Sequence, residues 1–550
     1  MARTPRSPGM RSARSRYAAQ LESRRSGVPA AELLARSRER RVAARAGASP
    51  AERGLTRREL LGAGAGLAAA VSLAHPAGAL ARRAKRRTAP RIAIVGAGLA
   101  GLRCAHVLWT ESPSAPLAAS VFEAEAERAG GRCWTLRDYF SGGLQSEHGG
   151  AFLNSDQRAV RGLAAKLGLA EEVVDGGDLP SGEEVFLIGG SRYTEAEAQH
   201  DWEAFGFAAF HAAGRQLKSA AGEARLDAMS VPEWLDSTPI GAGSRFGRLM
   251  LANAVTENGG NPSDLSALDL IELLTSNPRS SLEPLPGDDE RYHLIGGNDQ
   301  LASGMVAALP AGTVRFGHVL TAVRHNADRS IALSFDGPSG PVDETFDYVV
   351  LALPFSTLRE ADLSKSALSA QKRKVIRTMG MGTNAKIHLE LSRKTWPALG
   401  YSGATYGEWQ RLACGWDDTV QLGPSASPAL YLAFPGGRAG DSGLTGPAHG
   451  PAPAADVAFA LGEIEPLFSG TTAAFTGRAY EDRWARHPFS HGAYSYYRVG
   501  QAASYGQIAG RTEQRILFAG EHTSIANIGF LDGAVETGER AARQLLRRLA

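Results

Sequence analysis

The sequence predicts an α/β protein of two domains. Three observations support this: the chain length, a glycine-rich turn between a strand and a helix near residue 96, and an apolar strand that leads into the last helix. At 550 residues, the chain exceeds the roughly 250–300 residues at which one hydrophobic core stops growing. Hydrophobic residues make up 43% of the chain and charged residues 21%. This composition is typical of an ordinary globular protein, and it excludes a disordered or a membrane-embedded one.

The basic residues of the chain are concentrated at its N-terminal end. Residues 1–81 hold 15 Lys and Arg but only 5 Asp and Glu, whereas the remainder holds 45 basic and 52 acidic residues. A basic chain would ordinarily indicate nucleic acid or an anionic surface as a partner. Because the remainder is mildly acidic, we expect no nucleic-acid partner, and a cationic small molecule suits this charge.

Residues 56–81 contain the three parts of an export signal: the paired Arg57 and Arg58, a short apolar run, and a small-x-small cleavage site. The apolar run has about 16 residues, which is short of the length that spans a bilayer. We therefore interpret the segment as a twin-arginine signal peptide rather than an anchor. This implies the twin-arginine export machinery as a partner and a periplasmic or extracellular location. Residues 1–55 are expected to be a basic, disordered extension.

Residues 91–95 form a β-branched run typical of a buried strand, and they lead directly into a Gly-x-Gly-x-x-Gly turn at Gly96, Gly98 and Gly101. The three glycines permit a tight turn, the approach of a pyrophosphate, and close packing of helix and strand. The helix that follows presents free N–H groups to the phosphates. Glu123 ends a second strand, where a carboxylate accepts hydrogen bonds from an adenosine ribose. Together these features predict a Rossmann-like βαβ unit that binds a dinucleotide.

Two further glycine-containing stretches follow the acid: Gly-Gly-Arg at 130–132, and Glu-His-Gly-Gly at 147–150. With these stretches the chain, from residue 91 to its C-terminus, resembles the flavin monoamine oxidase family, within the superfamily of FAD-dependent amine oxidases and L-amino acid oxidases. The resemblance implies that Gly131 and Arg132 lie on the pyrophosphate of FAD. It also implies that the loop with Gly149 and Gly150 reaches the flavin.

The C-terminal part of the chain carries the most specific part of this resemblance. The resemblance places the backbone of Val319 against the adenine, and Gly520 and Glu521, at the end of an apolar strand, beside the ribityl chain. It places the start of the last helix, near Gly533 and Ala534, against the flavin. The helix dipole at that end would stabilise the negative charge that the flavin gains on reduction.

Three residues are predicted to act on the substrate or on the reacting atoms. In this family the flavin accepts the hydride, so the protein mainly orients a neutral amine and excludes water. The alternation over residues 384–391 alone predicts an exposed lysine at Lys386, but the resemblance places it where a lysine holds a water at the flavin. Tyr494 lies in a stretch that resembles the one bringing an aromatic wall up to the flavin, and Phe530 falls where the second wall lies. Trp484, in the same stretch, is predicted to bind the cofactor.

The resemblance also indicates how the cofactor is held. Some members bind FAD covalently through a cysteine where this chain has Ala493, so we expect non-covalent FAD. Cys104, Cys133 and Cys414 have neither metal-ligand nor disulfide-framework spacing, and we interpret them as buried thiols. The histidines form no metal-binding pattern, so we expect no metal site.

The predicted reaction is oxidation of a primary or secondary amine to an imine and then an aldehyde, with oxygen reduced to hydrogen peroxide. Related L-amino acid oxidases carry an arginine soon after the acid-x-Gly-Gly loop, whereas here Arg158 arrives late, which favours amines. An L-amino acid oxidase is one alternative. A non-oxidase FAD-binding protein or a desaturase-like dehydrogenase is another. Phe530, where such enzymes often have tyrosine, leaves the preferred amine open, and the sequence indicates no oligomeric state.

The resemblance implies that the FAD-binding domain is built from discontinuous segments. We expect residues 90–165, 291–380 and 480–550 to form this Rossmann-like domain. Residues 166–290 and 381–479 are expected to form an α+β substrate domain. The sequence also predicts a strand-like run over 314–323, helices within 201–220 and 265–274, and a short strand at 429–434.

Overall fold

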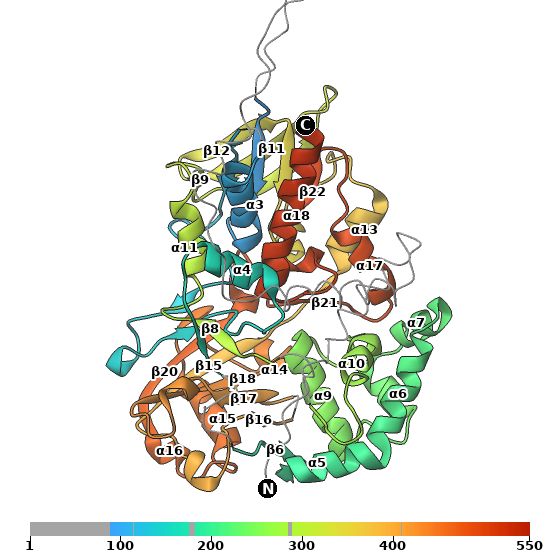
Figure 1. The fold of residues 1–550 in the computed structure, drawn as a ribbon, viewed down its shortest axis with the longest axis vertical. Helices are drawn as coiled ribbons and strands as arrows, with labels where there is room; N and C mark the ends of the chain where they lie inside the picture. The colour runs from blue at the N-terminus through green and yellow to red at the C-terminus, as the bar shows by residue number, and fades with distance from the viewer. Residues whose placement is uncertain (1–88, 114, 175–181, 284–288, 409) are drawn as a thin grey trace, which may run out of the picture. The chain divides into compact units, whose positions relative to one another are not determined.

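A computed structural model describes residues 89–550, apart from residues 114, 175–181, 284–288 and 409 (Figure 1). The predicted extension (1–55) and signal segment (56–81) lie outside the described residues, and both stay predictions. In the part of the chain that is described, no helix is long and apolar enough to cross a membrane. Residues 90–550 belong to one compact unit by their contacts, so the boundaries of the two expected domains also stay predictions.

The strand before the glycine turn lies in the middle of a five-stranded sheet. Strand β1 (Ile92–Val95) pairs in parallel with β2 (Ser120–Phe122) on one side and with β13 (Tyr348–Leu351) on the other. Strands β9 (Val314–Arg315) and β22 (Ile516–Phe518) form the two edges, again in parallel. Every residue of β1 is buried, as expected for a parallel strand that is covered on both faces. Segments from three distant parts of the chain therefore share one Rossmann-like sheet.

Helices cover one face of this sheet (Figure 1). Helix α3 (Leu99–Thr110) follows the glycine turn and packs against α18 (Leu531–Leu549), with α4 (Arg158–Lys166) and α11 (Gln300–Ala307) beside them. A Cβ at Gly538 of α18 would overlap the carbonyl oxygen of Ala100 in α3, so the two helices approach as closely as glycine allows. The buried Arg103 in α3 donates from Nε to Oε1 of Glu539 in α18 over 3.0 Å. The last helix is thus fixed onto the helix that follows the turn.

A three-stranded antiparallel meander lies on the other face of the parallel sheet. It consists of β10 (Val319–His325), β11 (Ile331–Gly337) and β12 (Gly340–Phe346), and the ring of Phe122 in β2 stacks on Phe335 at 4.3 Å between centroids. The prediction of one strand-like run over 314–323 was wrong, because Gly317, with φ of 68°, turns the chain between β9 and β10. Helices α12 (Phe355–Leu358), α13 (Ala370–Thr378) and α17 (Ala502–Ala509) complete this side.

A second, antiparallel sheet has six strands in the order β16-β17-β18-β15-β20-β19. Their bounds are Thr405–Tyr406 (β16), Cys414–Asp417 (β17), Ala429–Phe434 (β18), Ala385–Leu391 (β15), Phe475–Arg483 (β20) and His449–Pro451 (β19). The predicted strand at 429–434 is confirmed as β18. Helix α15 (Ala454–Ile464) packs against the apolar face of this sheet.

The polar face of β15 is buried, which corrects the pattern-based prediction of an exposed lysine there. Lys386, His388 and Glu390 alternate along the strand and are all buried. Each contacts the segment 141–149: Lys386 through backbone carbonyls, His388 through the Ser146 hydroxyl, and Glu390 through a backbone N–H. The alternation indicates a polar face correctly, but that face is covered by a distant loop rather than by water.

A helical region follows the first part of the nucleotide-binding fold. The helix predicted within 201–220 is found as α6 (Phe207–Gln216), with a π-helical turn over 202–206 before it. The one predicted within 265–274 is found as α10 (Ala267–Leu274). The other helices here are α5 (Glu195–Asp201), α7 (Ala220–Asp227), α8 (Val231–Asp236) and α9 (Arg245–Asn258).

Short paired strands connect these parts. They are β3 (Thr135–Leu136) with β4 (Ser146–Glu147), β5 (Glu171–Val173) with β8 (Tyr292–Leu294), β6 (Val185–Ile188) with β7 (Ser191–Thr194), and β14 (Gly380–Met381) with β21 (Ser495–Tyr496). Two short helices remain, α14 (Gly437–Asp441) and α16 (Thr471–Ala474).

Candidate active site

The glycine turn forms a cradle at the start of α3. A Cβ at Gly101 would overlap the carbonyl oxygen of Gly96, so only glycine fits there. At Gly98, the N-cap of the helix, a Cβ would meet nothing within 4 Å, so the space in front of the helix start is open. Gly130 donates its N–H to the carbonyl of Ala97 over 2.8 Å, which brings the second glycine stretch beside the first. An open helix N-terminus lined by glycines fits the diphosphate of a dinucleotide.

Glu123 stands beside this cradle. Its Oε2 accepts the N–H of Ala97 over 2.6 Å, and its Oε1 accepts the N–H of Glu125 over 3.0 Å. Burial raises the pKa of this carboxyl, against the effect of the two backbone hydrogen bonds. Its carbonyl accepts the N–H of His318 over 2.7 Å, so Val319 begins β10 close by. The two residues predicted for the adenosine side, Glu123 and Val319, therefore lie in one place.

Arg132 and Glu521 meet in a nearly buried ion pair. Nη2 of Arg132 donates to Oε1 of Glu521 over 2.9 Å. The same carboxylate accepts the hydroxyl of Ser495 and the N–H of Gly529, each over 2.8 Å. Burial alone would raise the pKa of Glu521, but the charge of Arg132 and these hydrogen bonds hold it below its usual range. Two residues predicted to bind the cofactor thus hold each other in position.

The start of α18 lies against the loop with Gly149 and Gly150. A Cβ at Gly150 would come within 2.8 Å of the Leu531 side chain, in the first turn of the helix. Phe530 is the N-cap, without a side-chain hydrogen bond at that cap, and Ala534 donates its N–H back to the Phe530 carbonyl over 3.3 Å. The helix N-terminus predicted to face the flavin is therefore beside the loop predicted to reach it.

Lys386 extends from β15 to the same loop. Its Nζ donates to the carbonyl oxygens of Glu147 and Gly149, each over 2.7 Å. Burial lowers the pKa of this ammonium, and the negative charges of Asp418 and Asp482 oppose that shift. An ammonium has three N–H donors, and these carbonyls accept from two of them. Among the described residues, these two carbonyls are the acceptors, so the lysine holds the loop while one donor is left to act on something else.

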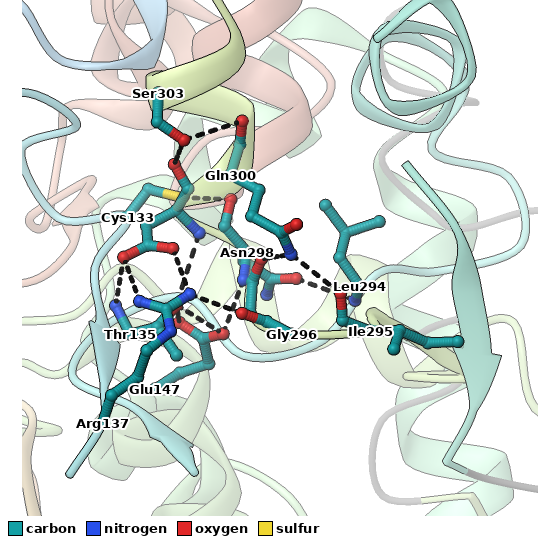
Figure 2. A network of polar contacts seen from close by, with 12 residues as sticks. Cys133, Thr135, Arg137, Glu147, Leu294, Ile295, Gly296, Asn298, Gln300 and Ser303 are labelled. Carbon is teal, nitrogen blue, oxygen red and sulfur yellow. Dashed lines mark hydrogen bonds and ion pairs between the residues drawn. The ribbon is translucent and has the colours of Figure 1, made fainter. Parts of the chain in front are cut away.

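The carboxyl side chain of Glu147 also anchors the loop, through the contacts with Thr135 and Asn298 that Figure 2 shows. It accepts the N–H of Asn298 over 2.7 Å and the hydroxyl of Thr135 over 3.0 Å. Nδ2 of Asn298 donates to the carbonyls of Gly150 and Ala151 over 3.0 and 2.7 Å. Burial raises the pKa of Glu147 to about 8. Sequence reasoning assigned no role to Asn298, although it follows the Gly-Gly pair at 296–297.

Three aromatic residues surround this loop and the start of α18. Nε1 of Trp484 donates to the carbonyl of His148 over 2.8 Å. The Tyr494 hydroxyl donates to the carbonyl of Thr256 in α9. The Tyr494 ring lies 3.2 Å from the position that a Cβ at Gly529 would take, one residue before Phe530. Tyr494 and Phe530, the residues predicted to form the two aromatic walls, therefore both lie near the start of α18. That their rings face each other stays a prediction.

The buried carboxylate of Asp482, which was not predicted from the sequence, contacts His148 of this loop. Asp482 accepts hydrogen bonds from Nδ1 of His148 over 2.7 Å, Nδ1 of His449 over 2.6 Å and Nε2 of His388 over 2.9 Å. Candidate ligand atoms of Asp482, His148 and His449 lie within 4.8 Å of one another. However, two ligands around tetrahedral zinc lie about 3.3 Å apart, whereas these separations are hydrogen-bond lengths. No local spacing pattern could have indicated this group, because its members are far apart in the chain.

Two other predictions concern Arg158 and the three cysteines. Arg158, the late arginine after the loop, opens α4 and is exposed. The prediction of buried free thiols at Cys104, Cys133 and Cys414 is confirmed. Burial raises the pKa of Cys104 and of Cys414 to about 12.

The chain is similar to known proteins in sequence and in fold. The profile of the family described as "Flavin containing amine oxidoreductase" matches residues 99–546. Amine oxidase [flavin-containing] A of Equus caballus is 23% identical over 478 residues, which cover 83% of this chain and 85% of that protein. A flavin-dependent L-tryptophan oxidase of Lentzea aerocolonigenes is 27% identical over 263 residues, covering 46% and 52%. Wild-type putrescine oxidase bound to putrescine has a similar fold, with a TM-score of 0.69 at 21% identity, over 84% of this chain and 99% of that one.

Proposed function

The chain belongs to the family of flavin-containing amine oxidoreductases, and from this premise we propose that it oxidises a primary or secondary amine to an imine. Membership makes it an FAD-dependent oxidoreductase that acts on amines. In the proposed reaction the amine loses two electrons and two protons, and water hydrolyses the imine to an aldehyde with release of ammonia, or of a primary amine when the substrate is a secondary amine. Oxygen takes up the electrons and protons as hydrogen peroxide.

The observation that carries the proposal is the position of Lys386. Two of its N–H donors are held by the carbonyls of Glu147 and Gly149, so the direction of the third is fixed. We propose that this donor holds a water beside the flavin during reaction with oxygen. A buried ammonium with one directed donor is suited to stabilising negative charge that develops on oxygen.

The cofactor is proposed to be non-covalent FAD. When bound, FAD would accept two electrons from the amine and pass them to oxygen. The residues of this chain that would hold it are the glycines of the 96–101 turn with Glu123 and Val319, the Arg132–Glu521 pair with Gly131 and Gly520, and the start of α18 at Gly533 and Ala534. Ala493, where a covalent link would form, offers no nucleophile. The three cysteines are buried elsewhere.

The aromatic residues are proposed to orient the amine. Tyr494 is tied to α9 through the Thr256 carbonyl, and Trp484 is tied to the loop through His148. Fixed rings of this kind exclude water and favour the positive charge that develops on the amine. Phe530 would complete the slot at the start of α18.

An L-amino acid oxidase is the second candidate, and the match to an L-tryptophan oxidase favours it. A substrate carboxylate requires a cationic partner inside the site. The arginine considered for that role, Arg158, is exposed at the start of α4, which weighs against this candidate. A dehydrogenase that passes electrons to an acceptor other than oxygen would produce no hydrogen peroxide.

Export by the twin-arginine route is proposed from residues 56–81. This route carries folded proteins, which suits a chain that closes around FAD before it leaves the cytoplasm. N-terminal sequencing of protein recovered outside the cytoplasm tests this: a mature end near residue 82 supports it. The proposal is contradicted if the protein stays in the cytoplasm and replacement of Arg57 and Arg58 by lysine does not change its location.

A peroxide assay over a panel of substrates tests the reaction. Monoamines, diamines, polyamines and L-amino acids are supplied to the flavin-loaded protein, and peroxide and aldehyde or keto acid are both measured. Peroxide in equal amount to aldehyde supports amine oxidation. Keto acid instead of aldehyde supports the second candidate, and imine formation without peroxide supports the dehydrogenase.

A further inference from the structure

Asp482 stands in the middle of a row of three residues that crosses the antiparallel sheet. In β20 it is paired with Lys386 in β15 on one side and with His449 in β19 on the other. Residues paired across antiparallel strands project to the same face. His388, two residues after Lys386, projects to that face as well. An ammonium, a carboxylate and two imidazoles are therefore set side by side by strand register alone.

The carboxylate of Asp482 is fully buried and fully hydrogen-bonded. Oδ1 accepts from Nδ1 of His148 and Nδ1 of His449, and Oδ2 accepts from Nε2 of His388. Burial alone would raise the pKa of this carboxyl, but the charges and hydrogen bonds of the imidazoles hold it well below its usual range. Because an ionised carboxylate cannot donate, each of the three facing nitrogens carries a proton. Asp482 is thus a buried anion with three fixed partners.

His148 links this anion to the loop that holds Lys386. It lies between Glu147 and Gly149, whose carbonyls accept from Lys386. Its ring is held by Asp482 on one edge and stacked on Trp134, with 3.7 Å between centroids. Its own carbonyl accepts from Trp484. A ring fixed in this way leaves the neighbouring carbonyls little freedom to turn away from the lysine.

The charge of Asp482 acts on the same lysine. Lys386 is buried, and the protein groups that accept its protons are neutral carbonyls. A buried ammonium needs negative charge nearby to stay charged. Asp482, its cross-strand partner, is one of the carboxylates that supply it.

We propose that Asp482 is a positioning residue for amine oxidation: through His148 it fixes the carbonyls that orient Lys386, and it supplies negative charge beside that ammonium. The proposal rests on the function proposed for Lys386. Asp482 itself is shielded by its three imidazoles and is assigned no contact with substrate. Its effect on the reaction must therefore pass through the lysine.

A double-mutant cycle tests this dependence. Asp482→Asn keeps the shape of the side chain and removes its charge. The substitution is made in the unaltered protein (the parent) and in the Lys386→Met variant. The rate at which oxygen reoxidises the reduced flavin is measured by rapid mixing. The expected result is a slowing of about tenfold or more in the parent and less than about twofold in the Lys386→Met background. Glu481→Gln is the matched control, since Glu481 precedes Asp482 on β20, is buried, and projects to the opposite face.

A second readout does not involve turnover. In protein labelled with ¹⁵N only in histidine, the proposal requires His148 and His449 to carry their protons on Nδ1. Because the amide of Asp482→Asn keeps only one acceptor oxygen, at least one of the three N–H signals of His148, His388 and His449 should be lost in this variant, and all three should persist in Glu481→Gln. If Asp482→Asn does not fold, His449→Phe removes one donor at a less buried side chain and enters the same cycle, with a smaller slowing that again depends on Lys386.

Three outcomes overturn the proposal. The first is an equal slowing in both backgrounds, which would indicate a general structural effect. The second is an unchanged rate in a folded Asp482→Asn variant. The third is one equivalent of zinc that remains with the flavin-loaded protein after dialysis and is lost in Asp482→Asn, which would make the group a metal site. Failure of the unaltered protein to bind flavin or oxidise amines would instead contradict the proposed function.

Discussion

Nη2 of Arg132 lies 2.9 Å from Oε1 of Glu521, and this ion pair joins two loops that are 389 positions apart in the sequence. Both loops are predicted to contact the cofactor. The pair therefore closes the cofactor site and also contributes to the fold, because removing one partner leaves a nearly buried charge without its counterpart.

The first prediction concerns Glu521→Gln. Losing the carboxylate opposite Arg132 should destabilise the protein by about 1–3 kcal/mol and weaken FAD binding, measured by thermal unfolding and by release of flavin fluorescence. Glu197→Gln is the control, since Glu197 pairs with Arg245 in an exposed ion pair that contributes about 0.5 kcal/mol or less. Glutamine can keep the cap that Glu197 makes with Thr194 at the start of α5. Equal effects of the two substitutions would contradict the role given to the Arg132–Glu521 pair.

A second prediction separates folding from cofactor binding at the glycine turn. Gly98 has φ of −68°, and a Cβ there meets no protein atom within 4 Å. Gly98→Ala should therefore fold with unchanged stability in the flavin-free protein, yet bind FAD at least about tenfold more weakly, because the methyl group enters the space meant for the pyrophosphate. Gly162→Ala, also with nothing within 4 Å, is the control. Unchanged FAD affinity in Gly98→Ala would place the cofactor elsewhere.

A third prediction concerns stability against pH. Burial raises the pKa of Glu147 to about 8, well above its unfolded value near 4.5. Between these two pKa values the folded state binds a proton that the unfolded state does not, so this group's contribution is fully present below about pH 4.5 and is lost as pH rises toward 8. The unfolding free energy of the parent should fall relative to that of Glu147→Gln by about 1 kcal/mol per pH unit in that window. Parallel curves from denaturant unfolding would contradict this.

The fourth prediction divides the reaction into its two halves. Lys386→Met should slow reoxidation of the flavin by oxygen by about tenfold or more, whereas reduction by the amine should change much less, because the proposed water acts on oxygen. Rapid mixing with and without oxygen measures the two steps separately. The assignment of Lys386 fails if reoxidation is as fast as in the parent.

The fifth prediction distinguishes amines from amino acids. Because Arg158 is exposed, Arg158→Ala should leave the ratio of activity on an amine to activity on the corresponding amino acid unchanged. Both activities are measured by peroxide release. A selective loss of activity on the amino acid would favour the L-amino acid oxidase candidate.

The nucleotide-binding half was predictable from sequence because its signals are local. The strand, the turn at Gly96, Gly98 and Gly101, and the acid at Glu123 lie within about thirty residues and follow one another in the order that the βαβ unit requires. The apolar runs at 349–354 and 516–519 predict buried strands, since a parallel strand covered on both faces has no polar positions. The strands are found at Tyr348–Leu351 and Ile516–Phe518. Other local signals were overlooked, such as Thr194 with Glu197, which form a capping box at the start of α5.

The antiparallel sheet and its buried polar groups were harder to predict from the sequence, because their contacts join distant segments. The alternation in β15 indicates a polar face, but it contains no information that residues 141–149 cover that face. Asp482 and its imidazoles come from a loop and three strands, and their proximity depends on strand register. Asn298 received no role from the sequence, although its side chain supports the loop with Gly150. Such groups are found only when the sheet that assembles them is known.

Oxidation of amines by a bound flavin can be followed in the visible absorption of the purified protein during anaerobic addition of an amine. The account predicts a yellow protein with one flavin per chain, whose flavin band disappears with amine and returns, with formation of hydrogen peroxide, when oxygen is admitted. A protein that stays colourless after expression with ample flavin, or a flavin band that no amine changes, would contradict it.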